Sequence, residues 1–132
     1  MTTERTNKIY YCPIEVAIDL VGGKWKPLIL SHLREGCLGF EEIGRRVPLA
    51  TRGMLAGQLR ELERDGLVQR RELAEFPPPI EYSLTVEGCR LIPILDQLRQ
   101  FGRDFASRSG VEIHEELELY EATASPALSE AS

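Results

Sequence analysis

The 132-residue chain lacks the features that mark membrane proteins and most enzymes. It has no apolar run long enough to cross a bilayer, and the residues after Met1 lack the apolar stretch of a signal peptide. It also has no glycine-rich phosphate loop, nucleophile elbow or paired-carboxylate arrangement. These absences predict a soluble cytoplasmic protein that is not an enzyme and has no membrane partner.

Cysteine and histidine are scarce and scattered. The three cysteines, Cys12, Cys37 and Cys89, are odd in number and widely spaced, which argues against a disulfide framework and against a CxxC metal site. His32 and His114 each stand without a Cys or acid at metal-ligand spacing. We therefore expect reduced thiols, no bound metal and no cofactor.

Acidic residues exceed basic ones, but they are unevenly distributed. The net charge is −5, yet residues 110–132 hold six acids and no Lys or Arg, so residues 1–109 carry 16 basic and 15 acidic side chains, a net charge of +1. Residues 43–60 contain four arginines and no acid. Since local field, more than total charge, attracts a phosphate backbone, this segment fits nucleic acid. A solvated arginine surface is the alternative interpretation.

The apolar pattern divides the chain into three parts. Residues 1–11 form a polar N-terminal arm, residues 12–107 form one domain, and residues 108–132 form an acidic tail whose end we expect to be disordered. Within the domain, Cys12-Pro13 opens a first helix, because the missing N–H of Pro13 is tolerated at a first helical position, and Gly22-Gly23 ends it. A second helix begins near Trp25, with the turn beyond it at Gly36 and Gly39.

The middle of the chain predicts a helix-turn-helix followed by a hairpin. Residues 40–47 form a short helix closed by Pro48, and Thr51 can cap the next helix, whose apolar side carries Leu55, Leu59 and Leu62. Gly66 ends that helix, and residues 67–68 and 80–84 supply two short strands separated by three prolines. A recognition helix that is followed by a hairpin, or wing, predicts an α+β, mostly helical fold. This fold is a winged helix-turn-helix with a two-stranded wing.

The last helix carries more apolar surface than one core needs. It starts at Thr85, passes Pro93 as a bend, and presents apolar residues on more than one side. These residues are Leu91, Ile92, Ile94, Leu95, Leu98, Phe101 and Phe105. The excess predicts a C-terminal dimerisation helix in a homodimer.

Several of these motifs together resemble the HxlR-type bacterial transcription regulators, relatives of the MarR group. The matching motifs are Cys12-Pro13, Gly22-Gly23-Lys24-Trp25, residues 54–67, and residues 81–85 with Gly88. The resemblance implies a homodimeric winged-helix protein that binds a double-stranded DNA operator and dimerises through its first and last helices. It also implies that a Cys beside the first helix senses electrophiles or oxidants, as in several members.

The chain departs from the family in two places. Gly53 and Gly57 occupy recognition-helix positions where members carry long polar side chains. Because glycine has no side chain, these two positions would let the helix backbone approach DNA more closely. The wing tip reads Pro77-Pro78-Pro79, without the basic residue expected there. Arg70 and Arg71 on the first wing strand then become the expected phosphate contacts.

The predicted DNA-binding set lies on the recognition helix and the wing. It comprises Thr51, Arg52, Gly53, Ala56, Gly57, Arg60, Arg64, Arg70 and Arg71. Thr51, Arg52 and Ala56 are the candidates for base contact, since the N-terminal residues of a recognition helix reach the groove floor. The alternative for the arginines is pairing with Glu61 or Glu63 on the helix surface.

Cys12 is the predicted sensor. It precedes Pro13 at the positive end of a helix, which favours a thiolate, and Lys8 adds to this field. The alternative is a small residue at a helix cap. Cys37 and Cys89 have no comparable context, and we expect them to be buried and inert.

Two other functions remain open from the sequence. A small ligand in a dimer cleft could replace Cys12 as the signal, or the winged helix could serve protein association through the acidic tail. An enzyme modified by electrophiles is disfavoured because no base stands near any thiol in the sequence.

Overall fold

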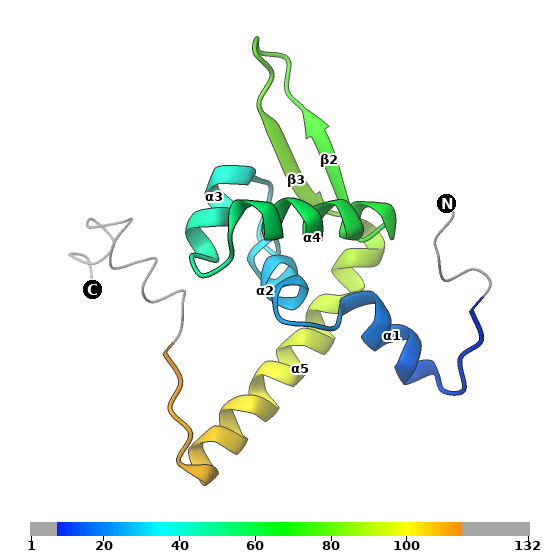
Figure 1. The fold of residues 1–132 in the computed structure, drawn as a ribbon, viewed down its shortest axis with the longest axis vertical. Helices are drawn as coiled ribbons and strands as arrows, with labels where there is room; N and C mark the ends of the chain where they lie inside the picture. The colour runs from blue at the N-terminus through cyan, green and yellow to red at the C-terminus, as the bar shows by residue number, and fades with distance from the viewer. Residues whose placement is uncertain (1–7, 115–132) are drawn as a thin grey trace.

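The computed structural model describes residues 8–114, so the predicted disorder of the tail's end lies outside the described residues. In chain order the elements are α1 (Pro13–Val21), α2 (Trp25–His32), β1 (Leu38–Gly39), α3 (Phe40–Arg46), α4 (Arg52–Arg64), β2 (Val68–Glu72), β3 (Ile80–Leu84) and α5 (Val86–Ser109). This order confirms the predicted winged helix-turn-helix. The helix-turn-helix is α3 and α4, and the wing is the β2–β3 hairpin (Figure 1).

Capping residues set the ends of α4 and α5. The Thr51 hydroxyl accepts a hydrogen bond from the Met54 N–H at 3.1 Å, and the Thr85 hydroxyl accepts one from the Gly88 N–H at 3.0 Å. Each bond satisfies an amide that has no partner within its own helix. Gly66, at φ 78°, takes the left-handed conformation that ends α4.

The sheet has three strands, one more than predicted. Its order is β1-β3-β2, and both pairings are antiparallel. Tyr82 on the central strand β3 lies opposite Leu38 of β1 and opposite Arg70 of β2. We predicted that Gly36 and Gly39 lie in a turn, but Leu38–Gly39 forms β1. A two-residue strand has no periodicity to detect, and its conformation depends on pairing with β3.

The core lies among α2, α3, α4 and the start of β2. Its buried members include Ile29, Leu30, Leu33, Ile43, Val47, Leu55, Leu59, Leu62, Leu67, Val68 and Leu95. Leu55, Leu59 and Leu62 are each at most 1% exposed, which confirms the predicted inner side of α4. The opposite side of this helix is thereby turned outward.

A close junction joins the end of α4 to the start of α5. The Thr85 hydroxyl donates to the Gly66 carbonyl at 2.6 Å, and the Thr85 N–H donates to the Leu67 carbonyl at 3.1 Å. A Cβ on Gly88 would lie 2.1 Å from that same carbonyl oxygen. Glycine is therefore required for α5 to pack this closely against the chain that leaves the recognition helix.

α5 extends past the rest of the domain. It continues through Pro93 as one helix, and its C-terminal half projects away from α4 and the wing (Figure 1). Ile94, Leu98, Phe101 and Phe105 recur at spacings of four, three and four residues, and each is more than half exposed in the single chain. These spacings place the four side chains in one stripe along the helix.

α1 also leaves an apolar surface uncovered. No residue of α1 is buried, and Ile14 and Ile18 are 65% and 62% exposed. The arm before it contacts α1, where the Tyr10 hydroxyl donates to Asp19. Within residues 8–114, no helix is long and apolar enough to cross a membrane.

The prediction that Cys37 and Cys89 are buried is wrong, because both side chains are exposed. Cys37 lies in the open loop between α2 and β1. In α5 the neighbouring Gly88 occupies the inward position, so Cys89, one residue further around the helix, faces away from the core.

Candidate nucleic-acid interface

The outer side of α4 brings most of the predicted DNA-binding residues together. Thr51, Arg52, Gly53, Arg60 and Arg64 are exposed, whereas Ala56 and Gly57 are half-buried. The apolar side of the same helix is anchored in the core, so its outer side is held in a fixed orientation. A helix presented in this way can enter a major groove.

Arg52 is paired with α3. Its Nη1 lies 2.7 Å from a carboxylate oxygen of Glu41, and its guanidinium carbon lies 5.0 Å from the centre of the Phe40 ring. Glu61 and Glu63 were the partners expected from the sequence, but the acid that pairs with Arg52 belongs to the preceding helix. Both charged groups are well exposed, so a phosphate can replace Glu41 at little cost.

Arg60 and Arg64 differ in their surroundings. Arg60 forms no ion pair with any residue in the described range 8–114, and its neighbour Glu61 binds the buried Lys26 at 2.6 Å. Arg64 Nε lies 3.6 Å from an Asp65 carboxylate oxygen. Of the two arginines, Arg60 therefore has fewer ion-pair contacts with the described part of the protein.

Gly53 and Gly57 are not required by the folding of the chain. A Cβ on Gly53 would contact only the Thr51 hydroxyl at 3.9 Å, and one on Gly57 only Arg60 Nη2 at 3.8 Å. Both distances are ordinary van der Waals contacts. Since glycine inside a helix costs about 0.5–1 kcal/mol relative to alanine, the protein's own packing does not explain these two residues.

The two wing arginines lie on the exposed strand β2. Arg71 donates to Glu81 on β3 at 2.9 Å, and this hydrogen bond, with the field of Cys37 and Glu81, raises the pKa of Arg71. Arg70 Nη2 lies 4.0 Å from Glu72. Both arginine side chains are exposed, on the strand that follows α4.

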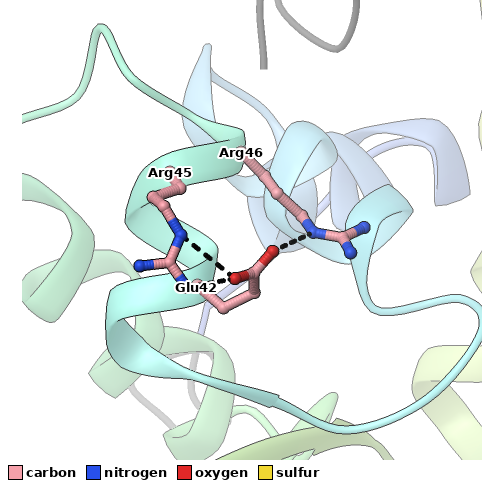
Figure 2. Close-up of polar contacts among 3 residues, drawn as sticks. All are labelled: Glu42, Arg45 and Arg46. Atoms are coloured by element: carbon pink, nitrogen blue, oxygen red, sulfur yellow. Dashed lines mark hydrogen bonds and ion pairs between the residues drawn. The ribbon is translucent and has the colours of Figure 1, made fainter. Parts of the chain in front are cut away.

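Two further arginines share one carboxylate on α3. Figure 2 shows Arg45 and Arg46 on opposite sides of Glu42: Arg46 Nε donates to Glu42 Oε2 at 3.1 Å, and Arg45 donates to Oε1 through Nε at 3.1 Å and through Nη2. From the sequence, we expected these arginines only to contribute positive charge to residues 43–60. Their spacing of three and four residues from Glu42 was the available signal for the pairing.

Cys12 occupies the N-cap of α1 and is exposed. The Glu15 carboxylate accepts hydrogen bonds from the backbone N–H groups of Tyr11 at 2.7 Å and Cys12 at 3.0 Å. A negative charge therefore already occupies the positive end of this helix. Lys8, expected to act on the thiol, forms an ion pair with Asp19 at 3.1 Å.

The described residues contain no group of three or more His, Cys, Asp and Glu side chains placed to hold a metal ion.

Residues 20–110 match the family model for the HxlR-like helix-turn-helix. The chain belongs to the HxlR-like helix-turn-helix family. A protein of Methanothermobacter thermautotrophicus described as an uncharacterised HTH-type transcriptional regulator is 49% identical over 98 residues, which cover 74% of this chain and 75% of the relative. HxlR-like proteins are transcription regulators and not enzymes, so the chain is a transcription regulator of this type.

Solved structures of other regulators share this fold. The reduced form of the redox regulator HypR superposes with a TM-score of 0.68 at 43% identity, covering 70% of this chain and 92% of that one. The reduced form of YodB from Bacillus subtilis superposes with a TM-score of 0.65 at 34% identity, covering 73% of this chain and 95% of that one. YodB has also been solved after treatment with diamide and with a bound quinone.

Proposed function

We propose that this HxlR-like regulator binds double-stranded DNA as a homodimer, with α4 of each subunit in the major groove. The outer side of α4 carries the proposal. It presents Arg52 and Arg60 beside two glycines that the fold does not require. Arginines supply phosphate and base contacts, and glycines allow the helix backbone to approach the DNA closely.

The stripe on α5 supports the homodimer. Four large apolar side chains are exposed along one line of this helix, and α1 adds Ile14 and Ile18. A spacing of four, three and four residues is the pattern by which two helices pack their side chains together. A second copy of the chain would cover this surface and set the distance between the two α4 helices, which must match two half-sites about one helical turn apart.

The test is selection of duplex DNA from a random-sequence pool by the full chain, followed by affinity measurements across a series of salt concentrations. We expect enrichment of an inverted repeat and a steep loss of affinity with salt. Failure to retain any duplex at low salt would favour the protein-association alternative.

We propose further that Cys12 is a thiol sensor. Cys12 is exposed at the start of α1, next to the apolar surface that we assign to the dimer. HypR is described as a redox regulator, and YodB has been solved with a quinone bound, which supports a role for this chain in sensing oxidants or quinones. A modified Cys12 could alter the packing of α1 and thereby the spacing of the two α4 helices, without contacting DNA.

The sensor is tested by comparing wild type with Cys12→Ser, using Cys89→Ser as the matched exposed-cysteine control. The measurements are the rate of alkylation at several pH values and DNA affinity before and after treatment with benzoquinone. We expect loss of the benzoquinone response in Cys12→Ser alone. An unchanged response in that variant would leave Cys12 as a helix-cap residue.

A further inference from the structure

A cavity of about 680 Å³ lies away from α4 and from Cys12. Its walls come from α2, the end of α3, the C-terminal half of α5 and residues 111–114. Cavities that hold small organic molecules typically measure about 300–1,000 Å³. The size is therefore suitable for a compact ligand.

The wall of this cavity is apolar on one side and cationic on the other. Its apolar members are Leu28, Phe105, Ala106, Val111 and Ile113. Its charged members are Arg34, Arg46, Arg99, Arg103 and one acid, Glu35. The guanidiniums in the wall outnumber its carboxylates, and Arg34 and Arg46 also pair with Asp96 and Glu42, so the wall keeps an excess of positive charge that favours an anion. The apolar side favours a ligand with a hydrocarbon body.

Two of the arginines are best placed to receive an anion. Arg99 forms no ion pair with any residue that the structure describes, whereas Arg34 is held by Asp96 through two hydrogen bonds of 2.8 Å. Arg46 is 29% exposed and shares Glu42 with Arg45. Burial, together with the charges of Arg46 and Arg99, lowers the pKa of His32, so near neutral pH this wall residue is an uncharged hydrogen-bonding group.

We propose that this cavity binds a small organic carboxylate with an aromatic or branched aliphatic body. The carboxylate binds Arg99 and Arg46, because the planar guanidinium matches a carboxylate in geometry and charge. The hydrocarbon body packs on Leu28 and Ile113. An inorganic anion such as phosphate would satisfy the arginines but leave the apolar wall unused.

The cavity is connected to the helix-turn-helix through Glu42. Arg46 lines the cavity, and Arg45, on the other side of the same carboxylate, is 57% exposed on α3 (Figure 2). A ligand carboxylate on Arg46 competes with Glu42 for that guanidinium and changes the charge balance around Arg45. This coupling rests on the proposed DNA binding, but ligand binding itself does not.

Binding is tested by calorimetric titration of the full chain with 2-naphthoate, with its neutral analogue 2-naphthamide, and with inorganic phosphate. We expect one 2-naphthoate per chain, with 2-naphthamide and phosphate each binding at least about tenfold more weakly, in line with a charge-assisted contact. Equal affinity for 2-naphthamide would show that the apolar wall alone binds the ligand and would overturn the proposal. Equal affinity for phosphate, or no 2-naphthoate binding, would also overturn the proposal.

Arg99→Gln should weaken 2-naphthoate binding by about tenfold or more, the effect of losing a charged hydrogen-bond partner. Arg90→Gln is the matched control, since Arg90 lies on the same helix, is exposed and pairs with Glu87 outside the cavity. The His32 ring resonance should shift on 2-naphthoate binding in wild type and in Arg90→Gln. Loss of binding in both variants, or in neither, would contradict the assignment of Arg99.

The coupling is tested by measuring DNA affinity with and without 2-naphthoate. Wild type should respond, and Glu42→Gln should still bind 2-naphthoate but lose the response. Binding of 2-naphthoate with no change in wild-type DNA affinity would refute the coupling and leave the cavity site intact. If the protein binds no DNA at all, the proposed function fails, while the calorimetric titration still decides the cavity site.

Discussion

The guanidinium of Arg52 at the start of α4 lies 2.7 Å from a carboxylate oxygen of Glu41 on α3. Arg52 is thus held by the protein itself in the DNA-free chain. For Arg52 to contact a phosphate or a base edge, that group must replace Glu41. We therefore expect this acid, on the helix that precedes α4, to oppose the proposed DNA binding.

We predict that Glu41→Gln strengthens DNA binding by about two- to fivefold, because an exposed ion pair contributes about 0.2–1 kcal/mol. Glu87→Gln removes the same charge from α5, where Glu87 pairs with Arg90, and should leave affinity near the wild-type value. Titration of a fluorescent duplex measures both variants. An equal gain in the two would show that overall charge, and not release of Arg52, is responsible.

Arg60→Ala and Arg52→Ala should have different effects on DNA binding. Arg60 has no ion pair among the described residues, so its loss should weaken binding to all sequences alike and lower the salt slope by about one phosphate equivalent. Arg52 lies at the N-terminal end of α4, so Arg52→Ala should also relax base preference by about 1–3 kcal/mol at one position. Affinities for the selected site and for single-base variants, at several salt concentrations, separate the two effects.

Gly88→Ala should destabilise the fold by about 1–3 kcal/mol, the usual cost of overpacking, because its Cβ would lie 2.1 Å from the Leu67 carbonyl oxygen. Gly57→Ala is the opposite case, since its Cβ meets only Arg60 Nη2 at 3.8 Å. It should raise the free energy of unfolding by up to about 1 kcal/mol. Thermal denaturation of both variants measures the contrast, and a tolerated Gly88→Ala would contradict the close packing of α5.

Leu98→Asp should dissociate the proposed homodimer. Leu98 is 60% exposed in the single chain and lies in the apolar stripe of α5, so the dimer would bury the new carboxylate. We expect dimerisation to weaken by at least about tenfold, because burying an unpaired polar group costs about 1–3 kcal/mol or more.

Sedimentation velocity measures the change, with Gln97→Asp as the control that adds the same charge at the adjacent exposed position. A monomeric wild type at micromolar concentration would rule out the homodimer itself.

The stability of the fold should fall on the acid side of neutrality. The pKa of His32 is lowered from its ordinary value of 6.5 by burial and by Arg46 and Arg99. Below that ordinary value the unfolded chain binds a proton that the folded chain resists, so the free energy of unfolding decreases as the pH falls toward the folded pKa. His32→Gln should reduce this loss, and His114→Gln, at an exposed position, should not.

Denaturant unfolding at about pH 7.5 and about pH 5.5, which span the histidine range, measures the effect. The same loss of stability in wild type and His32→Gln would assign it to other groups.

The sequence by itself determined the order of the helices and of the two wing strands, and which side of α4 is buried. Leu55, Leu59 and Leu62 repeat at helical spacing, Thr51 and Gly66 mark the two ends, and two short strands follow. These signals are local in sequence: periodicity and capping depend on residues at most a few positions apart. The outward side of α4 followed from the same stretch, whereas the family resemblance also depended on Cys12-Pro13, residues 22–25 and residues 81–88.

Only the tertiary structure decided which side chains meet across elements. The pairs Arg52–Glu41 and Lys26–Glu61, the strand Leu38–Gly39 and the contact between Gly88 and Leu67 all join residues from different elements. The exposure of Cys89 and the arginine-lined cavity also depend on where α5 lies. Neither composition nor periodicity encodes such contacts, because they arise when packing of the shared core brings separate helices and strands into register.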